Sequence, residues 1–270
     1  MEKSYGVTSR HTNTSAEDFY LEELRIKGFS VVSDILNNEE LMDVREKLDA
    51  IYTTQVNQFG EENLELIHEK NLVRLPLKYH GLFLEKIAAN EKVISLIKKI
   101  LGEYFILHLQ NGIINKPGEA HHQSSWHRDL PYQNFVISKP LAIGALYCID
   151  EFTVETGCTY VVPFTHKTEE IPSAEYIAEN KFAVIAKAGA VILFDSMLFH
   201  QAGYNASKII RRGINNVYTT PVLKQQINIP KALQGRYSED IFLRRFLGYD
   251  ADVADDDILW REKRLKRFTK

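Results

Sequence analysis

The amino-acid sequence predicts a mainly β fold with flanking helices, in the form of a sandwich or barrel. Six short apolar or alternating runs, separated by Gly, Pro and Asn, are typical of strands. The helical period of apolar residues is confined to the two ends of the chain, 1–102 and 223–270. No repeat, low-complexity tract or linker separates these parts from the β core at 103–222, so we expect a single domain over 1–270.

Capping signals predict three helices in the N-terminal part. Ser15 and Asp18 fit a capping box, and Asn37 with Glu40 fits a second one. Asn90 is placed to cap a third helix. The apolar faces expected for the second and third helices consist of Leu41, Val44, Leu48, Ile51, Val93, Ile94, Ile97, Ile100 and Leu101.

The strands expected in the core are 104–109, 141–149, 158–163, 182–187, 190–199 and 211–220. The tail then returns to a helical pattern. Tyr237, Ile241, Phe242 and Phe246 are spaced to face one way. Either the tail is a permanent packing helix, or its aromatic residues, including Trp260, form a mobile cover over a reactive site.

Composition gives no general case for nucleic acid or membrane as a partner, because the formal net charge is −3. The basic C-terminal run WREKRLKRFTK follows the acidic DADVADDD and is typical of a solvated helix end. No run approaches ~20 apolar residues, and we expect a cytoplasmic protein with a small-molecule substrate. Cys148 and Cys158 form no Cys-x-x-Cys pair, so neither a disulfide nor a thiolate zinc site is expected.

The segment SSWHRDLPYQ places His127 two residues before Asp129. In an extended segment, positions i and i+2 project to the same side, so one metal ion could take both side chains. The spacing alone is weak, because a chain with nine histidines often contains His-x-Asp by chance. His200 is the candidate third ligand, since it follows the apolar strand AVILFDSMLF.

Two histidines and one carboxylate on one face of an octahedral ion form the triad of non-haem Fe(II) oxygenases. Three coordination sites then stay open, enough for a bidentate 2-oxo acid and O2. A structural zinc site would instead be closed by a fourth ligand. The same three ligands would also serve a zinc-dependent hydrolase, and this alternative stays open.

A dicarboxylate co-substrate needs a cation for its distal carboxylate, and arginine fits it bidentately. If 190–200 and 211–220 form a hairpin, Arg211 lies nearly opposite His200. Neighbours on a strand face opposite sides, so Arg211 shares its face with Gly213 and Asn215. Arg212 belongs to the bulkier face, which we expect to pack away from the site.

With these motifs in order, the sequence resembles the phytanoyl-CoA dioxygenase family of Fe(II)/2-oxoglutarate oxygenases. The likeness begins in GFSVVSDILNNEELMDVREKLD and continues through LIKKILGEYFILHLQNGIINKPG, WHRD and ETGCTYVVPFTHK. It ends in FHQAGYNASKIIRRGINNVY, where His200, Asn205 and Arg211 match the family's spacing. One departure is Phe164-Thr165 where Gly-Ser is usual, which puts the conformation of that turn in doubt.

The resemblance implies a double-stranded β-helix, a cupin-like jelly roll with the metal at its open end. It implies that 2-oxoglutarate and O2 become succinate and CO2 while the substrate is hydroxylated. Mapped here, His127, Asp129 and His200 hold Fe(II), Arg211 holds the distal carboxylate of 2-oxoglutarate, and Gln110 is a weaker co-substrate candidate. The residues expected to meet substrate are Trp126, Tyr132, Gln133 and Arg74.

The resemblance also bears on the outcome of the reaction. Related halogenases carry a small residue at the carboxylate position, so Asp129 favours hydroxylation over halogenation. His121, His122 and His166 are expected to be loop histidines. A jelly-roll binding protein without turnover is the second alternative, against which the intact triad and arginine argue.

Overall fold

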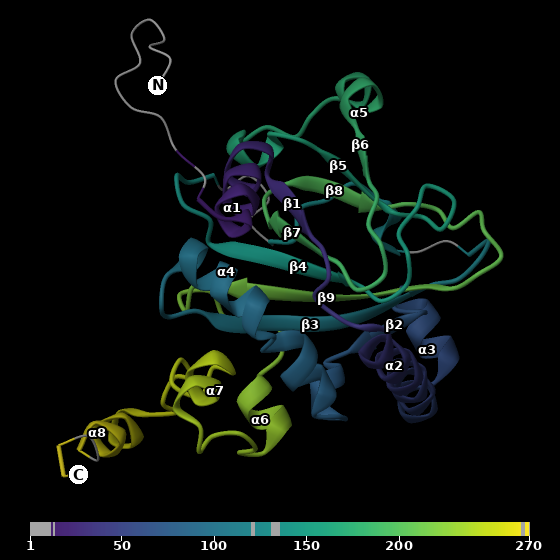
Figure 1. Ribbon diagram of the computed structural model, residues 1–270. Helices are drawn as coiled ribbons and strands as arrows, with labels where there is room; N and C mark the ends of the chain where they lie inside the picture. The colour runs from purple at the N-terminus through teal and green to yellow at the C-terminus, as the bar shows by residue number, and fades with distance from the viewer. Residues whose placement is uncertain (1–11, 13, 120–121, 131–135, 266–267, 270) are drawn as a thin grey trace, which may run out of the picture.

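Two antiparallel sheets face each other at the centre of the protein (Figure 1). They are seen in a computed structural model that describes residues 12, 14–119, 122–130, 136–265 and 268–269. The larger sheet has the strand order β1-β7-β4-β9-β3-β2, and the smaller has the order β6-β5-β8. The strands are β1 (Phe29–Val32), β2 (Leu72–Arg74), β3 (Ile106–Asn115), β4 (Ala142–Cys148), β5 (Thr159–Val162), β6 (Phe182–Val184), β7 (Val191–Asp195), β8 (Phe199–Ala202) and β9 (Arg211–Thr219).

Most helices lie beneath the larger sheet, on the side away from the smaller one (Figure 1). The α-helices are α1 (Ala16–Lys27), α2 (Asn38–Phe59), α3 (Glu61–Leu66), α4 (Glu91–Leu101), α5 (Ala174–Asn180), α6 (Ile229–Leu233), α7 (Ile241–Phe246) and α8 (Asp257–Leu265). Short 3-10 or π turns are η1 (Pro76–Lys78), η2 (Phe83–Ala88), η3 (His122–Ser124) and η4 (Thr165–Lys167). The fold class predicted from the sequence is confirmed.

The capping signals act as the sequence predicts. Ser15 and Asp18 form a complete capping box at the start of α1, and Asn37 with Glu40 does the same for α2. The side chain of Asn90 accepts a hydrogen bond at the start of α4. Each cap satisfies backbone N–H groups that a helix cannot satisfy by itself, which fixes where these helices begin.

The expected strands at 141–149, 158–163 and 211–220 correspond to β4, β5 and β9. The strand expected at 104–109 runs on to Asn115 as β3, with a bulge between Leu107 and Leu109. Two strands, β1 and β2, were not predicted. Both lie at the edges of the larger sheet and contain four and three residues, too few for a clear alternating pattern.

The run expected as one strand at 190–199 is two strands in different sheets. A turn separates them: Leu198 donates its N–H to Asp195 O, and Met197 donates its N–H to the Asp195 carboxylate. β7 continues the larger sheet, whereas β8 pairs with β5 in the smaller one. The expected hairpin between 190–200 and 211–220 is therefore wrong, because β9 lies between β3 and β4.

The two faces of the larger sheet bury different apolar clusters. Outward side chains such as Ile143, Leu193 and Ile214 pack with α2, α4, α6 and α7. Inward side chains such as Ile113 and Phe194 pack with the smaller sheet. The outer cluster includes residues from both helical ends of the chain, which supports the prediction of a single domain.

The tail packs on the outer face of the larger sheet, away from the space between the sheets. Phe246 is 1% exposed and lies 6.0 Å from the ring of Tyr218. Phe242 stacks on Phe246, whereas every residue of α8, including Trp260, is exposed. The packing alternative therefore describes α7, and α8 extends away from the body of the protein (Figure 1). No helix in the described part of the chain is long and apolar enough to cross a membrane.

Candidate metal centre and co-substrate site

The segment that contains His127 and Asp129 runs alongside β8 as a short antiparallel extension of the smaller sheet. His127 and His200 exchange both backbone hydrogen bonds, N–H to O distances being 2.9 and 3.0 Å. Asp129 donates its N–H to Ser196 O at 3.0 Å. This pairing brings a residue from the loop before β4 next to a residue on β8, although they are far apart in sequence.

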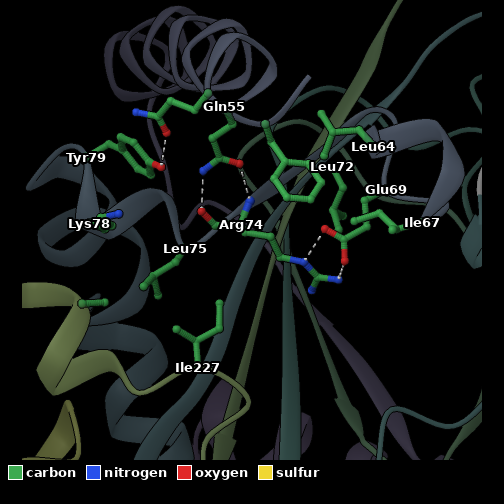
Figure 2. A pocket seen from close by; sticks show the side chains of 13 residues that line it. Gln55, Leu64, Ile67, Glu69, Leu72, Arg74, Leu75, Lys78, Tyr79 and Ile227 are labelled. Atoms are coloured by element: carbon green, nitrogen blue, oxygen red, sulfur yellow. Dashed lines mark hydrogen bonds and ion pairs between the residues drawn. The ribbon is translucent and has the colours of Figure 1, made fainter. Parts of the chain in front are cut away.

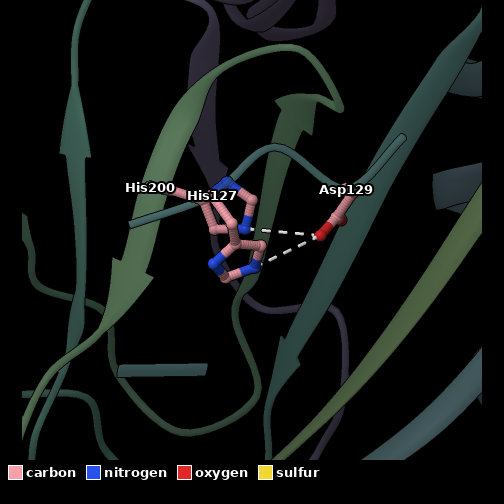
Figure 3. Close-up of side chains that lie close together, drawn as sticks. All are labelled: His127, Asp129 and His200. Carbon is pink, nitrogen blue, oxygen red and sulfur yellow. Dashed lines mark ion pairs between the residues drawn. The ribbon is translucent and has the colours of Figure 1, made fainter. Parts of the chain in front are cut away.

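The three expected ligands converge on one point (Figure 3). Asp129 Oδ1 lies 3.6 Å from His127 Nε2 and 3.5 Å from His200 Nε2. One ligand atom from each residue lies within 4.8 Å of the others. The expected alternation is also seen, because the Arg128 guanidinium points the other way and donates to the carbonyls of Thr165 and Thr168.

Backbone carbonyls fix the orientation of both imidazole rings. His127 Nδ1 lies 2.7 Å from Ser125 O, and His200 Nδ1 lies 2.8 Å from Leu198 O. A carbonyl oxygen can only accept, so each Nδ1 carries the hydrogen, and Nε2 of each ring is left to bind a metal or, when the ring is protonated, to donate to Asp129. In histidines that bind a metal, the other ring nitrogen is usually held by such a hydrogen bond.

The electrostatics of the triad are strongly coupled. Burial by itself raises the pKa of Asp129, but the neighbouring His200 and His127 outweigh it and hold that pKa well below its usual range. Burial lowers the pKa of His127, yet its hydrogen bond and attraction to Asp129 give a net rise. A positive charge placed between these three side chains is thus favoured, whether it comes from a proton or from a metal ion.

Arg211 lines the same cavity as the triad, on the facing sheet. It is 2% exposed, its guanidinium lies 4.3 Å from the ring centroid of Phe152, and Nη2 donates to Gly157 O at 2.9 Å. Its Nε is buried and has no hydrogen-bond partner among the described residues, and no carboxylate of that part of the chain forms an ion pair with it. Burial lowers the pKa of Arg211 to about 10, so it remains a cation near neutral pH.

Arg212, the next residue, faces outward as the strand period predicts. It donates to Asp49 Oδ1 at 2.9 Å and to Asp150 Oδ2 at 3.1 Å. The hydrogen bond to Asp49 raises the pKa of Arg212 above its ordinary value. Its donors are already paired with two carboxylates, so this arginine stabilises the contact between α2 and the sheet.

The structure adds Asn215 to the site. It lies on the same face of β9 as Arg211, and its Nδ2 lies 3.5 Å from Asp129 Oδ2. The sequence carried a signal for this residue, since positions 211, 213 and 215 share a face. The cavity at the triad has a volume of about 30 Å³. Its lining comprises Ile113, Gln123, His127, Asp129, Leu146, Thr159, Phe194, His200, Ala202, Arg211 and Asn215.

Gln110 does not reach the cavity. It is 1% exposed on the outward face of β3, where its Oε1 accepts from Leu77 N–H and its Nε2 donates to Phe83 O, both at 2.8 Å. The side-chain amide thus joins the sheet to η1 and η2. The expectation that it contacts 2-oxoglutarate is wrong for this arrangement, because both polar atoms point away from the triad.

Trp126 also lies outside the cavity lining. Its ring stacks on Phe199, with a centroid distance of 5.6 Å and an interplanar angle of 17°. It therefore anchors the ligand-bearing segment to β8 and is not placed as a pocket wall. Arg74 lies at the edge of the larger sheet, outside the triad cavity. Tyr132, Gln133 and His121 lie outside the described residues, as does the side chain of His122.

Two further residues of the sequence motifs hold turns. Phe164, which stands where the family usually has glycine, has a φ of 70°, in the left-handed region that glycine adopts most easily. Asn205 is buried and donates to Asn115 O and Ile209 O, which shapes the loop from β8 to β9. His166 is a structural residue, because it is buried and its Nε2 lies 3.2 Å from Arg25 O.

Comparison with known proteins agrees with this geometry. The model of the family described as phytanoyl-CoA dioxygenase matches residues 24–213, which contain the triad and Arg211. The chain belongs to the phytanoyl-CoA dioxygenase family. It is similar to the Mycobacterium tuberculosis protein called Uncharacterized protein Rv1501, at 34% identity over 82% of each chain. It is also similar to Dioxygenase cdmA of Talaromyces verruculosus, at 22% identity over 92% of this chain and 88% of that one.

Solved structures of low sequence identity share the fold. EctD from S. alaskensis, crystallised with 2-oxoglutarate and 5-hydroxyectoine, matches with a TM-score of 0.64 and 21% identity over 80% of each chain. The α-ketoglutarate-dependent epimerase SnoN matches with a TM-score of 0.57 and 18% identity, over 76% of this chain and 81% of that one. The double-stranded β-helix expected from the sequence is therefore confirmed.

Proposed function

We propose that this member of the phytanoyl-CoA dioxygenase family is an Fe(II)- and 2-oxoglutarate-dependent hydroxylase of a small molecule. The reaction would convert substrate R–H, 2-oxoglutarate and O2 into R–OH, succinate and CO2. The observation that carries the proposal is that Nε2 of His127, Nε2 of His200 and Oδ1 of Asp129 face one point. Beside them lies a buried arginine, Arg211, whose Nε has no partner among the described residues.

The donor set fits Fe(II). Two neutral imidazoles and one carboxylate are the ligands of the open triad, and thiolates are absent from the ligand group formed by the described residues. The carbonyls of Ser125 and Leu198 keep both Nε2 lone pairs directed at the metal position. Bound iron would supply the oxidising chemistry, and the protein would hold the ligands on one side so that the other positions stay open.

Arg211 fits the distal carboxylate of 2-oxoglutarate. A buried guanidinium with an unpartnered Nε is costly unless an anion joins it, and a carboxylate is its best partner. The ring of Phe152 packs on one face of the guanidinium and fixes its plane. Arg211 would thereby orient the co-substrate so that its 2-oxo acid end meets the metal.

Asp129 favours hydroxylation over halogenation, because its carboxylate occupies the coordination position that a halide would need. Neither rival activity has a feature of its own in support. A zinc-dependent hydrolase would leave Arg211 without an anion, and a binding protein without turnover would not need the three ligands to face one point.

The test is a turnover assay on metal-free protein reconstituted with Fe(II). We expect succinate to form in the presence of 2-oxoglutarate and O2. The rate should be low without a primary substrate and higher when one is added. There are two controls: protein reconstituted with Zn(II), and the Fe(II) protein assayed without O2. Neither should form succinate. Activity that needs neither O2 nor 2-oxoglutarate would favour the hydrolase, and binding of 2-oxoglutarate without succinate would favour the inactive protein.

A further inference from the structure

A row of three polar side chains crosses the inner face of the larger sheet, and we call it the polar lane. Asn215 on β9 is in register with Asn111 on β3, which is in register with Arg74 on β2. Side chains in register on neighbouring strands project to the same face. Asn215 contacts Asp129, so the lane leads from the metal centre to the edge of the sheet.

Asn215 lacks one of the hydrogen bonds that a buried amide normally makes. Asn215 directs its Nδ2 toward the Asp129 carboxylate, which leaves its Oδ1 buried and without a partner in the described part of the protein. Asn111 lies on the same face and is 6% exposed. The unpaired Oδ1 of Asn215 costs free energy, and a bound polar molecule would satisfy it.

Asn216, on the outer face of β9, differs from Asn215 in what its amide contacts. Asn216 lies one residue from Asn215, and its Nδ2 contacts the Tyr218 hydroxyl at 3.3 Å, which in turn donates to Ala88 O. Oδ1 of Asn216 is buried without a partner in the described part of the chain, as is Oδ1 of Asn215, so the difference lies in what the two Nδ2 atoms contact. Asn215 lies on the inner face beside the candidate metal ligand Asp129, where a bound ligand could reach its amide.

Arg74 ends the lane at a pocket of about 390 Å³ (Figure 2). Its Nε donates to Glu69 Oε2 at 3.1 Å, Nη2 pairs with Glu69 Oε1, and Nη1 reaches Gln226 Oε1 only at 3.4 Å. The Arg74 side chain is 28% exposed and that of Glu69 is 24% exposed. An incoming anion can therefore reach the guanidinium, and it would compete with Glu69.

We propose that the polar lane binds the primary substrate, and that this substrate is a small polar molecule with a carboxylate that pairs with Arg74. The inference rests on the proposed function, because it places the reacting carbon at the triad end of the lane. Neighbouring strands lie about 4.8 Å apart, so the distance from β9 to β2 across the lane is about 10 Å. The hydroxyl, amide or amine groups of the substrate pair with Asn111 and Asn215 on the way.

The arrangement predicts opposite effects for the two members of the ion pair. Arg74→Gln removes the cation that the carboxylate needs. Glu69→Gln removes the competing anion and frees the same cation. Lys78→Gln is the matched control: Lys78 lines the same pocket and loses the same charge, but it belongs to η1, outside the lane.

The experiment uses a panel of polar carboxylic acids about 10 Å long. Each acid is compared with its own primary amide, which has nearly the same shape but no charge. N-acyl amino acids, dipeptides and sugar acids supply such matched pairs. Binding to the metal-free protein is measured by saturation-transfer NMR. Stimulation of succinate formation is measured separately with Fe(II) and 2-oxoglutarate. Succinate formation without any probe reports on the proposed function alone, so a failure of the lane is distinguished from a failure of the oxygenase.

We expect at least one acid to bind and to stimulate turnover about 10- to 100-fold better than its amide, the usual range for a charge-assisted contact. Arg74→Gln should abolish this preference, Glu69→Gln should increase it, and Lys78→Gln should leave it unchanged. Equal responses to acid and amide, an unchanged preference in Arg74→Gln, or an absence of acids among the binders would each overturn the proposal. Basal succinate formation by the control variant Lys78→Gln should equal that of the wild type.

Discussion

The two faces of β9 give neighbouring residues of the same kind different partners. On the outer face, Arg212 pairs with two aspartates and Asn216 contacts a tyrosine hydroxyl. On the inner face, Arg211 has no carboxylate partner among the described residues, and Asn215 leaves its Oδ1 unpaired. Oδ1 of Asn216 is also buried without a described partner, so the contrast rests on the arginines: Arg212 is fully paired and stabilises the fold, whereas Arg211 keeps a donor available for a ligand.

The largest effect is expected from loss of a candidate metal ligand on the inner side. In His200→Ala, turnover should fall by more than about 100-fold. Mutation of a residue that only hydrogen-bonds to a metal ligand typically lowers metal affinity or activity 10- to 100-fold, and loss of the ligand itself should cost more. Metal content after reconstitution should fall as well, while the melting temperature should change little because the site lies at a strand end. Wild-type turnover in purified His200→Ala would remove the metal assignment.

Arg211→Ala tests the arginine that has no carboxylate partner among the described residues. We expect the concentration of 2-oxoglutarate needed for half-maximal turnover to rise about 10- to 100-fold, equivalent to roughly 1.5–3 kcal/mol for a charge-assisted contact. A titration of succinate formation against 2-oxoglutarate measures it. The matched control is Arg212→Ala, and a larger shift in that variant would contradict the proposed co-substrate contact.

The comparison extends to two buried carboxylates. Histidines hold the pKa of Asp129 below its usual range, whereas burial raises the pKa of Asp195 to about 6 from an ordinary value of 3.8. The folded state therefore binds the Asp195 proton more tightly than the unfolded state. Its contribution to stability is greatest below pH 4 and is lost as the pH rises to about 6.

Asp195→Asn should remove that pH dependence. The free energy of unfolding of the wild type, relative to Asp195→Asn, should decrease between pH 4 and 6 by up to about 3 kcal/mol. Denaturant unfolding at several pH values measures the difference, and Asn retains an oxygen to accept the Met197 N–H. A difference that stays constant over this range would show that Asp195 titrates normally.

Arg212→Ala should affect stability and leave the co-substrate requirement unchanged. The Asp150 side chain is only 14% exposed, and removal of Arg212 takes away one of the cations that pair with it. We therefore expect a loss of roughly 1–3 kcal/mol in the free energy of unfolding. Chemical denaturation measures this loss. An unchanged stability would mean that the outer ion pairs do not hold α2 against the sheet.

Local patterns predicted much of the fold and the metal site. The caps at Ser15, Asn37 and Asn90 depend on residues within three positions, so the sequence contains the whole signal. The same holds for His127 and Asp129, because alternation along an extended segment puts them on one side. The other parts of the fold and of the site depend on pairing between residues far apart in the chain. A single sequence does not show which distant segments pair.

Two errors illustrate that limit. The run at 190–199 is apolar throughout except for Asp195 and Ser196, and nothing in it indicates that its halves join different sheets. Gln110 is the weaker co-substrate candidate from the sequence, suggested by its place on the strand before NKPG. Its partners, Leu77 and Phe83, are distant in the chain, and they decide which way its amide points.

The edge of the larger sheet has a further consequence for self-association. Gln55 donates its amide N–H to Arg74 O at 2.7 Å and accepts the Arg74 N–H at 2.9 Å, as a neighbouring strand would (Figure 2). A free edge offers its backbone to other chains and promotes aggregation. With one side chain of α2 occupying the Arg74 peptide groups, β2 presents less unpaired backbone on which another copy could add a strand.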